Sequence, residues 1–442
     1  MKRPKLDSYD ISAILIIIVA VALRVILVAL GWPPIDSDEG TMGIMGMHIA
    51  FHGEWPVFFY GQGYMGAFEA YLAAIMFHFF GVSVFTLLIG LILIYMVFLI
   101  AMYRLSCLLY SKPLAIITLL FLCVGSNPML TRELLAIGGY PETLLFGSLL
   151  MLLAAWLAVT SKRDVSTFST SVCWRRLFAF CAWGLIAGLG IWTHVLVAPF
   201  VLVGGLLIII FCRRELLGWP AIGMVVFLII GMLPMIIYNF NAVLGQDTLS
   251  YLARVHSASG IILPPPDVLL ALQLRGAFLI SLPTATGLTP LCAPHEIQLF
   301  SVQNFYVMRC SASHAGWSLG VVALWLLAVI FVLREWLLMR AQRQEMTEEE
   351  RRATFARQMS HLALLATAAL TFLLYVVSPD AALFPIPTSR YLIGVLVAMP
   401  AVLWPLWHGA NLIKPLVLRW SIHHTVALRL SQVSFFARRA LL

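Results

Sequence analysis

Three carboxylates stand within four residues at Asp36, Asp38 and Glu39, just beyond the first apolar run. Like charges held this close repel one another, so a purely structural loop would gain little from all three. One carboxylate could act as a general base toward an acceptor hydroxyl or amine, while a neighbour orients the acceptor or a metal ion. The alternative interpretation is a solvated acidic turn in which Ser37 or Asp38 caps a helix.

The same loop continues into a stretch rich in glycine and aromatic residues, from Tyr60 to Tyr71. Gln62, Tyr64 and Glu69 are its candidate substrate contacts, because aromatic rings beside an acid could form a platform for a sugar. Aromatic residues also anchor proteins at the membrane–water interface, which explains the same rings about as well.

Four more candidate substrate contacts lie between later apolar runs, at Arg132, Tyr140, Glu142 and His194. A local ion pair between Arg132 and the adjacent Glu133 is the alternative for the first of them. His194 lies at the tip of a predicted helical hairpin, where a hydrogen-bonded interfacial histidine is the alternative to a substrate contact.

Arg390 and Tyr391 begin the last long apolar run on a side of the protein where positive charge is sparse. An arginine there can grip a phosphate with its fork of N–H donors. The alternative is a structural ion pair with Asp380.

These groups are carried by a strongly apolar chain of 442 residues, 62% hydrophobic and 11% charged. Soluble proteins carry about 25% charged residues, and apolar runs near the ~20 residues that span a bilayer recur along this chain. The net charge of +8 is spread over alternate loops, which is typical of membrane topology and argues against nucleic-acid binding. We predict an all-α, polytopic transmembrane bundle.

About ten transmembrane helices are expected, with Lys2, Arg3 and Lys5 placing the N-terminus in the cytoplasm. The first lacks a small-residue cleavage site and is predicted to be retained. The predicted spans are Ile11–Trp32, Ser83–Tyr103, Pro113–Val124, Pro141–Thr160, Leu177–Thr193, Val195–Cys212, Trp219–Phe240, Gly316–Met339, Leu362–Val377 and Tyr391–Trp407.

The outer loop 33–82 is expected to hold two interfacial helices, Thr41–Phe51 and Met65–Phe80. A second large outer loop, 241–313, is expected to be irregular backbone between short helices, because prolines and glycines are scattered through it. Residues 1–410 then form one transmembrane domain, and 411–442 a basic, amphipathic cytoplasmic tail.

Two features of the predicted topology leave their interpretation open. Arg24 within the first apolar run either packs against another helix, snorkels, or has a functional role. Cys292 and Cys310, the only cysteines in an outer loop, either form a disulfide or remain two thiols.

Acids for an acceptor, an arginine for a phosphate and a lipid-embedded body together indicate one chemistry. A sugar linked to a lipid phosphate could arrive from the bilayer and be transferred on the outer face. No glycine-rich phosphate loop or nucleotide-binding fold is visible, so a nucleotide-sugar donor is less attractive.

The layout resembles that of the GT-C superfamily of integral membrane glycosyltransferases, in the bacterial branch related to protein O-mannosyltransferases and aminoarabinose transferases. It shares one long helix, an outer loop opening with an Asp-Glu pair and two interfacial helices; Gly138-Gly139-Tyr140-Pro141-Glu142-Thr143 and Ser389-Arg390-Tyr391 also resemble recurring segments. The resemblance implies that Asp38 is the catalytic base, Glu39 its partner, and that Arg390 lies near the donor phosphate. The chain departs from aminoarabinose transferases in lacking a lysine in the second half of the first loop.

We therefore predict an inverting glycosyltransferase of a bacterial-type inner or plasma membrane, with both termini cytoplasmic. Its partners would be a polyprenyl-phosphate-sugar donor, a lipid, glycan or protein acceptor, and membrane lipids, with no nucleic acid. No metal ligand set is predicted, and a divalent ion (Mg²⁺ or Mn²⁺) is the one cofactor left open. The alternatives are an inactive scaffold subunit of a larger membrane complex and a lipid or solute transporter.

Overall fold

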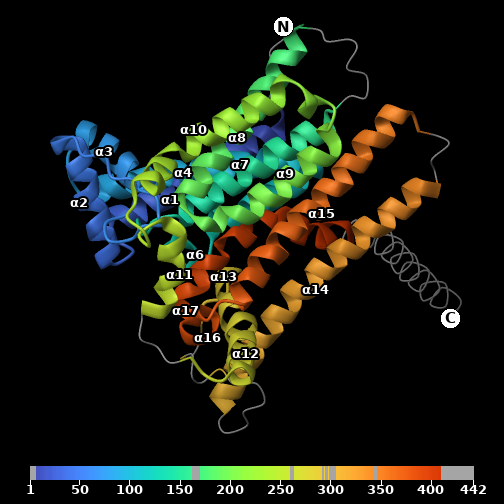
Figure 1. Cartoon of the computed structure of the whole chain (residues 1–442). Helices are drawn as coiled ribbons and strands as arrows, with labels where there is room; N and C mark the ends of the chain where they lie inside the picture. The colour runs from blue at the N-terminus through green and yellow to red at the C-terminus, as the bar shows by residue number, and fades with distance from the viewer. Residues whose placement is uncertain are drawn as a thin grey trace, which may run out of the picture.

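The structure is a bundle of helices, seen in the computed structural model of the chain (Figure 1). It describes residues 6–161, 170–258, 263–290, 293, 297, 305–341 and 346–409, and no strand occurs within those ranges. The predicted all-α fold is confirmed, while the predicted tail 411–442 lies outside the described residues.

The helices follow the apolar runs of the sequence. They are α1 (Ser8–Ala29), α2 (Ser37–His52), α3 (Phe68–Phe80), α4 (Val84–Leu109), α5 (Lys112–Val124), α6 (Asn127–Glu133), α7 (Tyr140–Val159), α8 (Thr170–Thr193), α9 (Ala198–Cys212), α10 (Trp219–Asn241), α11 (Thr248–Ala258), α12 (Pro266–Arg275), α13 (Leu282–Ala285), α14 (Phe305–Ala341), α15 (Glu348–Val376), α16 (Asp380–Leu383) and α17 (Pro385–Thr388). A π-helical turn η3 (Gly276–Ser281) joins α12 to α13, and a 3₁₀ stretch η4 (Ser389–Ala398) follows α17.

Several helices begin where the sequence supplies a side-chain cap. Asp7, Ser83 and Thr347 each form a reciprocal capping box at the starts of α1, α4 and α15. Such a box satisfies backbone donors that the first helical turn leaves without partners.

Ten helical segments of the described chain are long and apolar enough to cross a membrane. The protein is therefore a multi-pass membrane protein, as predicted. We call the end that carries the Asp36–Glu39 loop the acidic end, and the end that carries Arg213 and Arg340 the basic end. Figure 1 shows α2, α3 and α11 gathered at the acidic end, with the end of α14 and the start of α15 at the opposite end.

The second large outer loop, 241–313, is more ordered and more apolar than predicted. Pro266–Ala285 forms a continuous helical segment that is apolar enough to span a membrane, and α14 begins at Phe305, well before the predicted Gly316. The segment η3 packs on α14, α16 and α17. Because α10 ends and α14 begins at the acidic end, the segment adds no net crossing to the predicted topology.

The third predicted span, Pro113–Val124, corresponds to α5, which is the first helix of a bent pair. Helix α5 is followed after two residues by α6, and the two are bent by 83°. Gly125 at the bend has a φ of 55°, a conformation that glycine adopts without steric cost. The bend carries α6 under the acidic end of the bundle, where it contacts α7 and α13.

A buried ion pair joins α1 to α6 and rules out the alternative in which Glu133 pairs with Arg132. The Arg24 guanidinium donates to the Glu133 carboxylate at 2.5 and 3.1 Å, and both side chains are buried. It also donates to the carbonyls of Leu122 and Cys123, and it lies 3.8 Å from the Tyr95 ring centroid. Arg24 is therefore a packing element rather than part of a site.

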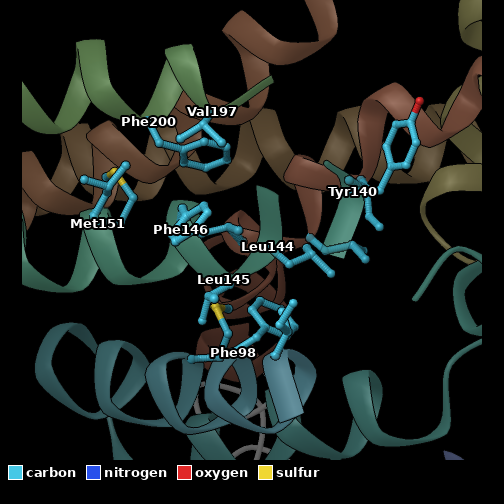
Figure 2. Close-up of a cluster of buried hydrophobic side chains, with 14 of the residues drawn as sticks. Phe98, Tyr140, Leu144, Leu145, Phe146, Met151, Val197 and Phe200 are labelled. Carbon is cyan, nitrogen blue, oxygen red and sulfur yellow. The ribbon is translucent and has the colours of Figure 1, made fainter. Parts of the chain in front are cut away.

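The core lies around α7, which packs against α4, α8, α9 and α15 (Figure 2). Phe98, Leu144, Phe146 and Phe200 are buried there. A Cβ at Gly147 would lie 3.1 Å from the Phe200 ring, so the missing side chain is what lets α9 approach α7. This core fixes Tyr140, at the first turn of α7, relative to the other elements of the acidic end.

Candidate active site

The start of α2 places the predicted acids in three different environments. The Asp36 side chain caps the helix by accepting from the Asp38 backbone N–H at 2.7 Å, and it is exposed. Asp38 sits in the first turn, where the helix dipole favours negative charge, and its side chain is half-buried. Asp36 therefore has a capping role, and Asp38 is the one of the three acids that lines the cavity described next.

Asp38 lines a cavity of about 220 Å³ at the acidic end. Seven of the predicted site residues meet in its wall: Asp38, Gln62, Tyr64, Tyr140, His194, Arg390 and Tyr391. They come from the first outer loop, the start of α7, the α8–α9 turn and η4. The predicted glycine–aromatic stretch, the hairpin tip and the last apolar run thus converge on one space.

Arg390 is held inside an aromatic enclosure. Its guanidinium carbon lies 5.0 Å from the Tyr140 ring centroid, and the rings of Tyr140 and Tyr391 are stacked at 6.1 Å. Its Nε has no hydrogen-bond partner among the described residues. An electrostatic interaction with Asp38 reaches it across the cavity. A half-buried cation with an unpartnered Nε donor is suited to receive an anionic group.

His194 enters the cavity as a neutral imidazole. Burial, and secondarily the charge of Arg390, lowers its pKa to about 4. Its Nδ1 accepts from the Leu196 backbone N–H at 3.2 Å, so the proton of the neutral ring lies on Nε2. His194 can therefore donate one hydrogen bond and adds no positive charge of its own near pH 7.

Glycines let the loops approach closely enough to form this wall. Gly139 has a φ of 85°, and a Cβ there would overlap the His194 ring. A Cβ at Gly66 would lie 2.6 Å from the carbonyl oxygen of Trp192, and the Gly66 backbone N–H donates to the Thr193 carbonyl at 2.9 Å. The glycine-rich motifs in the sequence thus serve loop packing.

Helix α11 covers the cavity from the second large loop. Leu252 contributes to its lining, and the Tyr251 hydroxyl donates to the Gly61 carbonyl. The Tyr251 and Tyr64 rings lie 5.7 Å apart. Burial, and secondarily the neighbouring Tyr391 and Tyr251, raises the pKa of Tyr64 to about 12. Tyr64 therefore stays a neutral hydrogen-bond donor.

Glu39, the predicted partner of Asp38, does not line the cavity. Its side chain is 1% exposed and its carboxylate oxygens have no hydrogen-bond partner in the described chain. Burial raises its pKa, an effect that the nearby backbone of Ala136 partly offsets. Glu39 lies behind Asp38, on the side of α2 that faces the bundle.

Three of the predicted substrate contacts lie beneath the cavity wall instead of in it. Glu69 and Glu142 are buried together, and Glu69 accepts from the Gly138 backbone N–H at 3.1 Å. Arg132 donates to the Ser389 hydroxyl at 2.5 Å and to the Thr284 carbonyl at 3.4 Å. These groups support the loops that carry Tyr140 and Arg390.

Asp380 and Ser378 also line the cavity, and neither is among the predicted substrate contacts. The sequence suggested Asp380 only as an alternative ion-pair partner of Arg390. Asp380 follows Ser378-Pro379 at the end of α15, a combination that is typical of an ordinary turn. The sequence feature that could have identified Asp380 as a site residue is its position, ten residues before Arg390 on the same loop.

A resident metal ion is not favoured by the donors present. Asp38 and Asp380 line the cavity with Arg390, whose charge opposes a cation. Within the described ranges no group of three or more His, Cys, Asp or Glu side chains could hold a metal ion. No step of the chemistry below is therefore assigned to a metal.

The sequence left open whether Cys292 and Cys310 form a disulfide, and the structure describes only one of the two. Cys310 is disulfide-bonded, while Cys292 lies outside the described residues.

No protein-family model matches the chain, and no curated protein matches it in sequence. Among solved structures, it is similar to the apo oligosaccharyltransferase of Archaeoglobus fulgidus, with a TM-score of 0.52 and 14% identity, over 95% of this chain and 52% of that one. ArnT from Cupriavidus metallidurans bound to undecaprenyl phosphate matches with a TM-score of 0.39 and 14% identity, over 92% and 79%.

The fold is that of the GT-C membrane glycosyltransferases, to which this oligosaccharyltransferase belongs. The resemblance that the first outer loop suggested is thereby confirmed at the level of the fold. The chain spans about half the length of the oligosaccharyltransferase.

Proposed function

We propose that the protein is a membrane glycosyltransferase that moves a sugar from a polyprenyl-phosphate donor to a lipid, glycan or protein acceptor on the non-cytoplasmic face. The observation that carries the proposal is that Asp38 and Arg390, from opposite ends of the chain, line one cavity with Tyr64, Tyr140 and Tyr391. The GT-C fold supports a glycosyl-transfer function.

The proposed reaction is a single displacement at the anomeric carbon. The Asp38 carboxylate takes the proton of the acceptor hydroxyl or amine, and the freed electron pair attacks the anomeric carbon. The bond between that carbon and the phosphate oxygen breaks with inversion. Its electron pair leaves on the polyprenyl phosphate, whose developing charge Arg390 stabilises. Asp38 ends protonated and returns the proton to water.

The neutral groups of the cavity have positioning roles in this proposal. The rings of Tyr64, Tyr140 and Tyr391 offer faces against which a sugar can pack, and Gln62 and His194 can donate hydrogen bonds to its hydroxyls. Glu39, Glu69, Glu142 and Arg132 act through the loops they support. Asp36 fixes the start of α2 and thus the direction of Asp38.

The site is proposed to lie outside a bacterial-type inner membrane, with both termini in the cytoplasm. The arginines gathered at the basic end support this orientation through the positive-inside rule. Residues 1–410 would form the catalytic domain and 411–442 a cytoplasmic tail.

Two substitutions test the proposal in a transfer assay with purified protein and lipid-linked donors. Asp38→Asn removes the base and should lower turnover by about 10²- to 10⁴-fold while donor binding persists. Arg390→Ala should raise KM for the donor more than KM for the acceptor, because it removes the phosphate contact.

Asp36→Asn is the matched control for the base, since asparagine also caps a helix and the charge change is the same. Arg254→Ala, at the same end but outside the cavity lining, controls for Arg390. Full turnover by Asp38→Asn would remove the base assignment, whereas the absence of transfer by the wild-type protein would favour the inactive scaffold.

A further inference from the structure

A second, larger cavity lies at the basic end, remote from Asp38. Its volume is about 550 Å³, and it is walled by the ends of α9 and α14 and the start of α15. Five arginines line it, at positions 213, 214, 340, 351 and 352. Such a volume falls in the range of small-molecule sites, about 300–1,000 Å³. The proposed transfer reaction makes no use of this cavity.

The charge of the cavity is strongly positive. Two glutamates, Glu215 and Glu348, also line it. Glu215 is engaged by Arg176, which is not in the lining, at 2.6 and 2.8 Å. The arginines thus outnumber the acids that could neutralise them. A cleft lined by one sign of charge and backed by apolar walls concentrates ions of the opposite sign.

Two of the five arginines are held in place by the surrounding helices. The Arg352 guanidinium donates to the Phe211 carbonyl at 2.8 Å and to the Ser161 hydroxyl at 3.3 Å, which ties α15 to the ends of α7 and α9. The Arg340 guanidinium carbon lies 3.7 Å from a Trp336 ring centroid. Fixed guanidinium groups lose less conformational freedom when they bind an anion.

The surroundings of the cavity identify the source of the anion. Ile210, Phe211, Met339 and Phe355 give it apolar walls. Next to it, Ile209 and Leu337 are 54% and 59% exposed. Helices α9 and α14 therefore continue from the cavity as apolar, outward-facing surfaces along which acyl chains can lie.

Tryptophans mark the depth of the cavity in the membrane. Trp174 and Trp219, on helices that begin at the basic end, are 70% and 76% exposed, and Trp336 lies in the cavity wall. Tryptophan is enriched at the membrane–water interface, at the level of lipid headgroups. The cavity is thus placed where a headgroup would meet it.

We propose that this cavity binds the phosphodiester headgroup of an anionic phospholipid of the adjacent leaflet. Arg340, Arg351 and Arg352 hold the phosphate, and the acyl chains lie against α9 and α14. Basic pockets between transmembrane helices are suited to such headgroups. Bound lipid would bridge α9 to the α14–α15 pair and stabilise the basic end.

The test compares lipid binding by two double variants of the full-length protein. Arg340→Gln/Arg351→Gln removes two charges from the cavity, while Arg104→Gln/Arg175→Gln removes two exposed charges from the same end outside it. Binding of phosphatidylglycerol, measured by native mass spectrometry and by thermal stabilisation in detergent, should weaken about 30-fold in the first variant only. Phosphatidylcholine should not stabilise either protein.

Three outcomes overturn the proposal. Equal weakening in the two double variants would mean that charge at the surface, and not the cavity, attracts the lipid. Saturable protection by inorganic phosphate without lipid would mean a site for free phosphate. Undiminished lipid binding by the cavity variant would place the lipid elsewhere. If Arg340→Gln/Arg351→Gln fails to fold, Arg340→Lys/Arg351→Lys replaces it, and should bind more weakly than wild type because lysine lacks the guanidinium fork.

Discussion

Glu69 shows how a carboxyl group can shape the site without entering it. It is buried beside Glu142, and burial together with that second carboxyl group raises its pKa well above the ordinary value. A raised pKa favours the protonated form of Glu69, whose carboxyl group still accepts the Gly138 backbone N–H. Its role is structural, because it holds the glycine turn in front of Tyr140.

Glu69→Gln is expected to be well tolerated and to change the pH dependence of stability. A group with a raised native pKa binds more protons folded than unfolded, so stability is lost as pH rises from the ordinary glutamate range toward the native pKa. Glutamine keeps the acceptor for Gly138 and stays neutral. The variant should therefore lose less thermal stability than wild type as the pH rises above the ordinary glutamate pKa of about 4.3.

Thermal unfolding in detergent at several pH values makes this measurement. Glu54→Gln, which alters a half-exposed carboxylate of the same outer loop, is the control. Parallel stability–pH curves for Glu69→Gln and wild type would show that Glu69 is ionised in the folded protein.

At the scale of elements, the cavity wall depends on loops that touch through glycines. Gly139 joins a left-handed φ of 85° to direct contact with His194, whereas Gly61 has a φ of 81° and no atom within 4 Å of the place where a Cβ would lie. Alanine substitutions at the two positions therefore separate the free-energy cost of the left-handed conformation from the cost of the steric contact with His194.

Gly139→Ala should destabilise the protein by about 1–3 kcal/mol more than Gly61→Ala, because only the first adds a steric clash. Each should also lose about 1–2 kcal/mol from the left-handed conformation. Unfolding in denaturant, with transfer activity measured in parallel, tests this difference. Equal losses would mean that the His194 turn moves freely away from α7.

The elements that the sequence predicted correctly are those with a single strong signal. Helices α2 and α3 were expected because acids and glycines punctuate the first loop between apolar runs. The segment Pro266–Ala285 was missed because Pro264-Pro265-Pro266 indicates a break, and Asp267 and Arg275 interrupt its apolar pattern. The bend between α5 and α6 was also missed, because Gly125 is equally typical of the end of a helix.

For the site, residue type was more informative than position. Asp38 and Arg390 could be proposed from charge and location, and the cavity brings them together. Glu69, Glu142 and Arg132 have the same character in sequence but face the interior. Which side of a loop meets the cavity is decided by packing between distant segments, and a single sequence does not record it.

At the scale of the whole molecule, the two cavities lie at opposite ends of the bundle, so the proposed functions require opposite sides of the membrane. Trp55 is 80% exposed at the acidic end and Leu217 is 90% exposed at the basic end. These positions can report which side each end faces.

In intact cells, Trp55→Cys should react with a membrane-impermeant maleimide, and Leu217→Cys should react only after permeabilisation. This result is expected because the arginines of the basic end favour the cytoplasm. Wild-type protein, whose described free cysteines are buried or half-buried, sets the background. Labelling in the reverse order would place the proposed transfer site in the cytoplasm.

The Arg24–Glu133 pair also constrains the order of events during biosynthesis. Helix α1 precedes α6 in the chain, so its guanidinium meets the bilayer before its partner exists. An arginine at the centre of a helix costs about 2.5–3.5 kcal/mol on insertion scales, and Arg24 lies nearer the end of α1. Most of the other residues of α1 are apolar, and their burial in lipid offsets this cost. Once Glu133 has been translated, the Arg24 guanidinium can form its ion pair with the Glu133 carboxylate. Burial of the Arg24 charge therefore depends on a residue that is translated 109 positions later.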